Sequence, residues 1–235
     1  MLFRSVPIHL PTLTGITVVS AGAGHSVALK NDGSVWTWGD NRVGELGNGI
    51  VGGVNPTPAQ VPGLTGVTAI ATFGAHTLAL KADGTVWAWG DNHAGQLGHG
   101  TVGGNSPVPV QVIGLSAMIH VIAGGIHSLA LGSDGLVRAW GDNNFGQLGD
   151  GTFTTRSTPV FVGGGLSQVS VVAAGGAHSL AMKVDGTAWA WGNNTSGQLG
   201  TGNFTTRPLP TAISGLTGGL FLAGGGAHSL AIVTP

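Results

Sequence analysis

The chain has no cysteine and carries very little charge. The absence of cysteine among its 235 residues excludes disulfides, thiolate metal sites and cysteine nucleophiles. Charged residues make up only 7% of the chain, with 8 Lys and Arg against 9 Asp and Glu, whereas a typical soluble domain has about 25%. A near-neutral surface offers little electrostatic attraction to DNA, RNA or an anionic membrane, so neither nucleic acid nor membrane is an expected partner.

Long apolar runs are also missing. No stretch of about 18 apolar residues is present, so no transmembrane helix is predicted. Pro7, His9 and Pro11 interrupt the N-terminal segment, which argues against a signal peptide. The compartment stays open, with the low charge and the Gly- and Thr-rich loops favouring an extracellular setting.

Glycine, by contrast, is abundant, and its 45 copies recur at fixed offsets as tight turns require. Histidines mark the period, with separations of 51, 51, 51 and 50 residues. A segment like HSLALK begins at each of them, and four of these are followed by a DGTVWAWGDN-like block and by G-[QE]-L-G-x-G. Self-similarity at such a period is typical of solenoids, propellers or arrays. The five histidines are His25, His76, His127, His178 and His228.

Each unit contains four short β-strand patterns. The HSLALK segment alternates in polarity, an Asp-Gly pair supplies a tight turn, and the TVWAWG segment is β-branched and aromatic. A Gly-rich loop then leads to a short strand such as 58–61, and a turn leads to an inner strand such as 67–71. The predicted fold is all-β: a β-propeller of four-stranded antiparallel blades, with four complete repeats plus a composite or partial fifth blade from the two termini.

We expect a single repeat domain over residues 1–235. The two terminal pieces together lack the D-G-x-V-W-x-W hairpin. They either share a fifth blade and close the ring, which removes exposed sheet edges, or leave an open array that a second copy completes through its terminal strands. The predicted divisions are the end of a partial unit at 1–20, unit one at 21–71, unit two at 72–122, unit three at 123–173, unit four at 174–223 and the start of another partial unit at 224–235.

The tryptophans all occupy the two positions of the W-x-W motif, which face one side of the sheet. A buried Trp of ~200 Å² contributes up to about 5 kcal/mol, which predicts packing anchors between blades, with ligand stacking as the alternative. The eighth position is Arg138. Its charge predicts either a hydrated or edge-exposed site in unit three, or an aliphatic stem that packs while the guanidinium reaches water. The seven tryptophans are Trp36, Trp38, Trp87, Trp89, Trp140, Trp189 and Trp191.

The consensus AGGxHSLALKxDGTVWAWGxNxxGQLGxGT, which recurs four times, resembles the regulator of chromosome condensation repeat. The resemblance implies a propeller, usually of seven blades. It also implies roles in guanine-nucleotide exchange on a small GTPase, chromatin binding, scaffolding and, in bacteria, protein inhibition. This chain has only about 4.6 units, no room for the long inserted loop of exchange factors, and a charge balance unsuited to nucleosomes. Exchange activity and chromatin binding are therefore not expected.

Several constant residues look chemical but fit structural roles. Symmetry would place the repeated histidines in a ring rather than within ~2.1 Å of one ion, so each is expected to make the same structural hydrogen bond. The Asp-Gly pairs and Gly-Asp-Asn triplets fit turn chemistry better than calcium loops. There is no Walker lysine, no nucleophile elbow, and a single glutamate, Glu45. We therefore predict no catalytic residues, no metal and no cofactor, and a protein that is not an enzyme.

The repeats differ from one another mainly in their loops. Units one and two carry VGG where units three and four carry FTTR, while the frame positions stay constant. Variable loops on a rigid frame suit recognition, and aromatic and Arg side chains are enriched at binding hot spots, with neutral drift as the alternative. The candidate binding residues are Arg42, His93, Phe145, Phe153, Arg156, Phe204 and Arg207.

The leading prediction is a non-enzymatic protein-binding or scaffold propeller that recognises a protein partner through variable loops on one face. One alternative is a structural, self-assembling repeat protein whose incomplete terminal blades pair between chains. Another is a propeller that binds carbohydrate or a small ligand in a central pocket.

Overall fold

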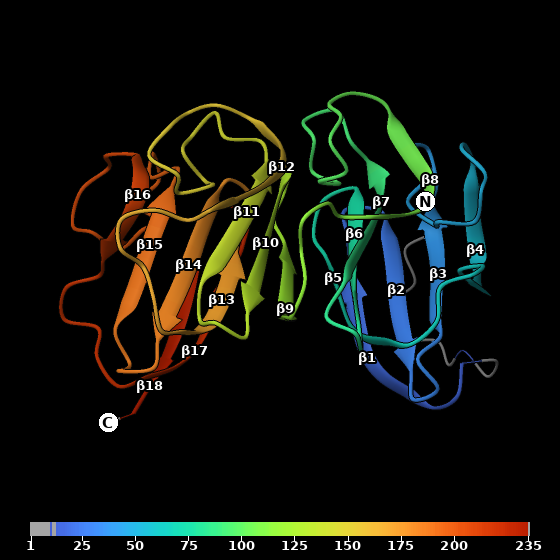
Figure 1. The fold of residues 1–235 in the computed structure, drawn as a ribbon, viewed down its shortest axis with the longest axis horizontal. Helices are drawn as coiled ribbons and strands as arrows, with labels where there is room; N and C mark the ends of the chain where they lie inside the picture. Colours follow the sequence, from blue (N-terminus) through green and yellow to red (C-terminus); the bar gives the residue numbers. More distant parts are fainter. Residues whose placement is uncertain (1–9, 11–12, 235) are drawn as a thin grey trace, which may run out of the picture.

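The computed structural model describes residues 10 and 13–234. Its strands form four four-stranded antiparallel sheets and one two-stranded sheet, set side by side as propeller blades (Figure 1). The predicted all-β propeller fold is confirmed. In chain order the strands are β1 (Ile16–Ala21), β2 (His25–Lys30), β3 (Val35–Asp40), β4 (Val54–Gln60), β5 (Val67–Thr72), β6 (His76–Lys81), β7 (Val86–Asp91), β8 (Asn105–Gln111), β9 (Met118–Ala123), β10 (His127–Gly132), β11 (Val137–Gly141), β12 (Arg156–Phe161), β13 (Val169–Ala174), β14 (His178–Lys183), β15 (Ala188–Gly192), β16 (Arg207–Ala212), β17 (Gly219–Gly224) and β18 (Ser229–Val233).

An Asp-Gly turn joins the second and third strands of each four-stranded blade. Between β2 and β3, the Asp32 carboxylate accepts hydrogen bonds from the Ser34 backbone N–H at 2.9 Å and from the Ser34 hydroxyl at 2.6 Å. Gly33 takes a φ of +78°, which suits glycine. The Asp83 and Asp185 turns repeat this arrangement, so the aspartates are turn residues.

The blades are shifted by one strand from the sequence units. The inner strand β5, which ends the first unit in the sequence, forms a sheet with β6 of the next unit. Likewise β1 pairs with β2 and completes the first blade. Residues 1–20 were predicted to be the end of a partial unit, and from Ile16 onward they form strand β1 of the first blade. Residues 1–9, 11 and 12 lie outside the described residues.

The fifth blade is partial, and in the part of the chain that the structure describes its strands come from the C-terminal segment. Strands β17 and β18 form their own two-stranded sheet. No strand pairing among the described residues joins β1 to either of them. Among residues 10 and 13–234, therefore, the two ends do not share a composite fifth blade or close a five-blade ring, because β1 is hydrogen-bonded within the first blade instead.

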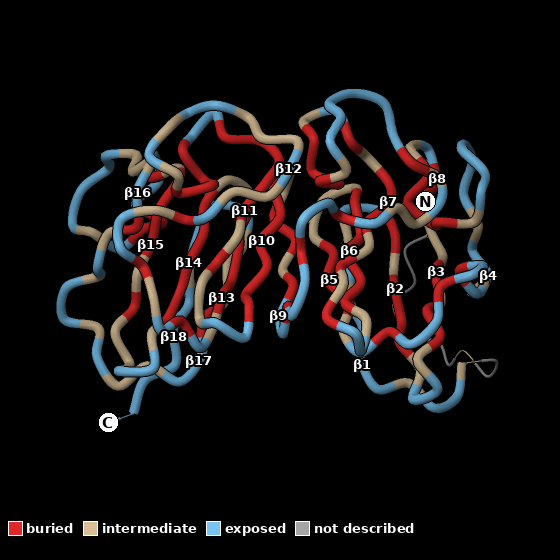
Figure 2. Tube along the Cα trace, in the orientation of Figure 1, coloured by how far each residue is buried: buried red, intermediate tan, exposed pale blue. Residues whose placement is uncertain are grey.

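The core lies between neighbouring blades, where tryptophan is the largest side chain. Trp89, Trp140 and Trp191 are fully buried. Trp140, from β11, packs with Leu80 and Leu97 of the preceding blade. Figure 2 shows buried residues along strands such as β6, β10 and β14, and exposed residues along the outer strand β4 and at the loop tips. Trp38, in the first blade, is only half-buried, because no blade precedes it among the described residues.

Arg138 does not extend its guanidinium freely into water. It forms two hydrogen bonds to the Asp134 carboxylate, at 2.7 and 2.6 Å, and lies 4.6 Å from the centre of the Phe161 ring. The guanidinium also holds the pKa of Asp134 down, at about 2. A charged residue is accommodated in a W-x-W position because the turn aspartate of its own blade neutralises it.

The inner ends of the blades approach each other so closely that glycine is required. A Cβ added to Gly74 would lie 2.0 Å from the backbone carbonyl oxygen of Gly125 in the next blade. Gly226, at the equivalent position of the fifth blade, has no neighbouring atom within 4 Å of an added Cβ. The same sequence position is therefore crowded between blades and open at the end of the array.

We expect Gly74→Ala to lower the free energy of unfolding by about 2–3 kcal/mol, because the backbone of one blade must shift. Gly226→Ala is the matched control and should change it by less than about 0.5 kcal/mol. Urea unfolding followed by tryptophan fluorescence measures both. Equal losses in the two variants would contradict the close approach of blades at Gly74.

None of the described residues belongs to a helix with the length and apolarity needed to cross a membrane.

Candidate functional site

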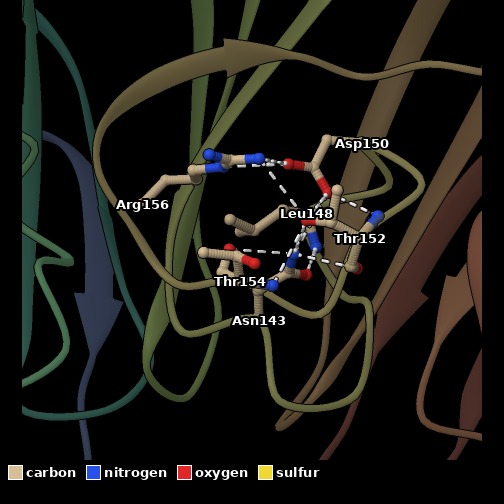
Figure 3. A network of polar contacts seen from close by, with 6 residues as sticks. All are labelled: Asn143, Leu148, Asp150, Thr152, Thr154 and Arg156. Carbon is tan, nitrogen blue, oxygen red and sulfur yellow. Dashed lines mark hydrogen bonds and ion pairs between the residues drawn. The ribbon is translucent and has the colours of Figure 1, made fainter.

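A buried asparagine lies at the first or second position of each loop between the third and fourth strands of a complete blade, and Figure 3 shows the one in the third blade, Asn143. In the third blade, the Asn143 amide donates to the backbone carbonyls of Thr152 at 3.0 Å and Thr154 at 3.1 Å. It also donates to the Asp150 carboxylate, and its oxygen accepts the Leu148 N–H at 2.9 Å. One side chain therefore ties several parts of the loop together. Asn41, Asn92 and Asn194 hold the equivalent loops.

A glutamine adds a second tie within the same loops. The Gln147 side-chain oxygen accepts the Phe145 backbone N–H at 2.9 Å, and its amide donates to the Asp142 carboxylate at 2.7 Å. Gln96 makes the same two bonds in the second blade. Because these groups are buried and paired, the loops have little freedom to rearrange.

The same glutamines also connect neighbouring blades. The backbone carbonyl of Gln96 accepts hydrogen bonds from the Ser128 hydroxyl and the Trp140 indole N–H, both at 2.9 Å. His76 Nε2 lies 2.9 Å from the Ser128 hydroxyl. Since Ser128 gives its only proton to Gln96, it accepts a hydrogen bond from His76, which therefore carries its proton on Nε2. The equivalent pairs are His25 with Thr77, His127 with Ser179 and His178 with Ser229.

Burial keeps these histidines neutral. It lowers the pKa of His25, His76 and His178 to about 4 and that of His127 to about 3. Their Nδ1 atoms have no hydrogen-bond partner. His228, in the partial blade, is exposed instead. Within residues 10 and 13–234, no three His, Asp or Glu side chains are grouped to hold a metal ion.

The candidate binding residues lie on the loops that join the third and fourth strands, or at the first residue after them. We call these loops, residues 41–53, 92–104, 142–155 and 193–206, the loop face. The loops of the second and third blades lie along the top of Figure 1. All seven candidates therefore belong to one end of the blades, although they do not share a single pocket.

The two candidates nearest the N-terminus are exposed and pair with the aspartate just before them. The Arg42 side chain is 77% exposed and its Nε lies 3.3 Å from Asp40. His93 Nδ1 contacts the Asp91 carboxylate. His93 also lines a pocket of about 340 Å³ between the second and third blades, with Ile126 and other residues of the third blade.

The arginines at the starts of β12 and β16 differ, although both end an FTTR segment. Arg156 donates from Nε at 2.9 Å and from a terminal nitrogen at 2.8 Å to one oxygen of Asp150 (Figure 3). Residue 201, which occupies the position of Asp150 in the fourth blade, is Thr201. Arg207 accordingly has no such carboxylate, and its buried Nε makes no hydrogen bond. Arg156 therefore holds its own loop, whereas no carboxylate at the equivalent position holds Arg207.

The three candidate phenylalanines expose their rings. Phe145 is 41% exposed, Phe153 54% and Phe204 72%. They come from the third and fourth blades, on loops fixed by Asn143 and Asn194. The loop face thus presents apolar rings at defined positions.

The sequence reasoning missed the asparagine and glutamine frame, assigning Gly-Asp-Asn to turn chemistry alone. The sequence did contain a signal for this frame, because the asparagine is constant in all four units, at Asn41, Asn92, Asn143 and Asn194. The residue before it is less constant, since it is Asp in three units and Asn193 in the fourth.

Comparisons with known proteins agree with this architecture. The family model described as RCC1-like domain matches residues 3–234. The chain is 35% identical over 227 residues to the human E3 ubiquitin-protein ligase HERC2, a match that covers 92% of this chain and 5% of HERC2.

Solved structures show the same fold. Human WBSCR16 superposes with a TM-score of 0.88 at 25% identity, over 97% of this chain and 60% of that one. Prp20p from Saccharomyces cerevisiae superposes with a TM-score of 0.83 at 24% identity, over 94% of this chain and 57% of that one. The chain thus spans less than two thirds of each of these relatives. The resemblance to the regulator of chromosome condensation repeat is confirmed, and the chain belongs to the RCC1-like domain family.

Proposed function

We propose that this chain is a binding module that recognises a protein partner through the loop face and acts by binding rather than by catalysis. The observation that carries the proposal is the set of exposed phenylalanines on loops held by buried hydrogen bonds. Loops that are already ordered lose little conformational entropy on binding, so their apolar contacts contribute more fully to affinity. Large aromatic side chains are typical of interface hot spots.

The low charge of the chain restricts the kind of partner. With only 7% charged residues, long-range electrostatic attraction is weak. The loop face offers Phe153, Phe204 and several exposed aliphatic side chains. Such a surface suits a partner with an apolar patch rimmed by hydrogen-bonding groups, rather than a highly charged polymer.

The relatives support a protein as the partner class. The structure of Prp20p is described together with its binding to Gsp1p and histones, and another structure holds Prp20 bound to Kap60. Those partners belong to Prp20. Only the general use of this propeller as a protein-binding frame is carried over to the present chain.

The test uses a double variant, Phe153→Ser with Phe204→Ser, as bait beside the parent chain in extracts of the native source. Quantitative mass spectrometry should show the specific partners of the parent reduced at least about tenfold on the double variant. Both baits should unfold at the same temperature, because the two rings are exposed.

The matched control is Val184→Ser. Val184 is 74% exposed but lies in the turn between β14 and β15, at the opposite end of the blades from the loop face. It should retain every partner. Equal recovery on the double variant and the parent would reject the loop face as the binding surface.

A further inference from the structure

The pocket between the second and third blades combines aliphatic residues with one carboxylate. We call this pocket, of about 340 Å³, the interblade pocket. Ala94 and Val102 line it from the loop of the second blade, and Ile126 lines it from the residue before β10. Asp142 and Asn144 line it from the loop of the third blade. Apart from Ile126, all of these residues belong to the loop face.

In the first two blades, the aspartate that precedes the buried asparagine has a basic residue beside it. Asp40 lies 3.3 Å from the Nε atom of Arg42, two residues further along the chain. Asp91 makes the equivalent contact with His93. Each loop therefore supplies a basic partner for its own carboxylate.

The third blade keeps the carboxylate but not the basic residue. Asp142 occupies the position of Asp40 and Asp91, whereas the residue two positions later is Asn144. In the fourth blade both charges are absent, because Asn193 and Thr195 occupy the two positions. No Lys, Arg or His among the described residues forms an ion pair with Asp142. The third blade is thus the one complete blade whose carboxylate here lacks a basic partner within the described part of the chain.

The Asp142 carboxylate is buried and is held in place by neutral donors. The residue is only 8% exposed. Its Oδ1 atom accepts hydrogen bonds from the Asn144 backbone N–H at 3.3 Å and from the Asn144 side-chain amide at 2.7 Å. Its Oδ2 atom accepts the Gln147 side-chain amide at 2.7 Å. A buried charge without an opposite charge is costly, so a cation that reached this carboxylate would bind favourably.

The second blade shows where such a cation binds. The Oδ2 atom of Asp91 accepts the Gln96 side-chain amide at 2.9 Å and also contacts His93 Nδ1. In the third blade the equivalent oxygen accepts the amide of Gln147 alone, as far as the described residues show. One acceptor position on Asp142 therefore remains for a donor from outside the chain.

We propose that the interblade pocket accepts a lysine or arginine side chain of the protein partner, whose charged head pairs with Asp142. Its methylene stem packs against Val102 and Ile126, since both basic side chains bury their stems on apolar surface. A charge-assisted hydrogen bond to a buried carboxylate is stronger than one between neutral groups. This inference rests on the proposed function, because the pocket lies on the loop face, and it names the residue type that the partner contributes there.

A metal ion fits the interblade pocket less well than a basic side chain. Asp142 is the carboxylate of its lining, and calcium takes six to eight oxygen ligands. No three His, Asp or Glu side chains of the described residues are grouped to hold an ion. The aliphatic residues around the carboxylate cannot act as ligands, but they suit a methylene stem.

The experiment titrates the intact chain with n-butylguanidinium, which carries the head group and part of the stem of arginine. In ¹H–¹⁵N correlation spectra we expect saturable shifts of the backbone N–H signals of Ile126, Asp142 and Asn144. The neutral analogue n-butylurea has a similar shape and should bind at least about tenfold more weakly, because it carries no charge. Equal binding of the two compounds, or no saturable shift at these residues, would overturn the proposal. This comparison uses the unaltered protein.

A matched pair of variants locates the site. Asp142→Asn removes the charge and should weaken n-butylguanidinium binding at least about tenfold. The fourth blade carries Asn193 at this position, so the substitution is compatible with the fold. Asp40→Asn removes the same charge from the first blade, outside the interblade pocket, and should leave binding within about twofold because distant charges are screened. Unchanged binding in Asp142→Asn would overturn the assignment to this carboxylate.

Partner capture separates this inference from the proposed function. On an Asp142→Asn bait, the specific partners should be reduced at least about tenfold, as on the Phe153→Ser and Phe204→Ser double variant. Partners lost on the double variant but fully recovered on Asp142→Asn would overturn the basic-residue inference and leave the loop face as the binding surface. Equal recovery on both baits would reject the two proposals together.

Discussion

Lowering the pH from 7 to 4 is expected to unfold the protein. Four histidines between the blades are buried and neutral in the folded state, and burial lowers their pKa to about 4 for His25, His76 and His178 and about 3 for His127. In the unfolded chain their pKa returns to about 6.5. The unfolded state therefore binds more protons below pH 6.5, and acid favours it.

The sign and size of the effect follow from this linkage. The stabilising contribution is fully present above pH 6.5 and is lost as the pH falls towards 4. Each histidine contributes up to about 3 kcal/mol over that range, and four together about 10 kcal/mol, which is comparable with the whole stability of a typical domain. The turn aspartates have pKa values below 3.8 and titrate at lower pH. Urea unfolding at half-unit steps of pH measures the profile.

His127→Gln separates the proton linkage from simple loss of packing. The variant is less stable at every pH, but the slope of unfolding free energy against pH between 6 and 5 should fall by about 1.4 kcal/mol per pH unit, the value for one group. His93→Gln is the control, because His93 is on the loop face and exposed. An unchanged slope in His127→Gln would show that this histidine is not held neutral by burial.

Trp140→Ala is expected to lower the free energy of unfolding by about 3–5 kcal/mol. Trp140 is fully buried, packs against Gly98 and donates to the Gln96 carbonyl. Its removal leaves a large cavity between the second and third blades, and the Gln96 carbonyl then accepts a hydrogen bond from Ser128 alone among the two donors it has now. Urea unfolding at pH 7 measures the loss.

The matched substitution is Trp38→Ala in the first blade. Trp38 occupies the same position of the motif but is only half-buried, with no preceding blade among the described residues. We expect a loss of about 1 kcal/mol. Equal losses at Trp38 and Trp140 would mean that the indole contributes within its own sheet rather than between blades.

The blade architecture could be predicted because several independent patterns repeat together. The Asp-Gly turn, the W-x-W strand and the alternating histidine strand each specify a local structure, and their recurrence requires stacked blades to bury both sheet faces. The tryptophans at positions 89, 140 and 191 are indeed buried between blades. Which strands share one sheet could not be predicted in this way, because the length of the repeat alone does not show where one sheet ends and the next begins.

The candidate site was less accessible from the sequence. Variation among the repeats located the loop face, but it did not distinguish Arg156, which is held by Asp150, from Arg207, which is not. That difference depends on residue 201, six positions earlier in the chain, which is threonine instead of aspartate.

Hydrogen–deuterium exchange on the complex with a captured partner tests the loop-face account most directly. We predict slower exchange in residues 41–53, 92–104, 142–155 and 193–206 and unchanged exchange in the opposite turns, including the one that contains Val184. Protection confined to those opposite turns, or to β17 and β18, with no change in the loops would contradict it.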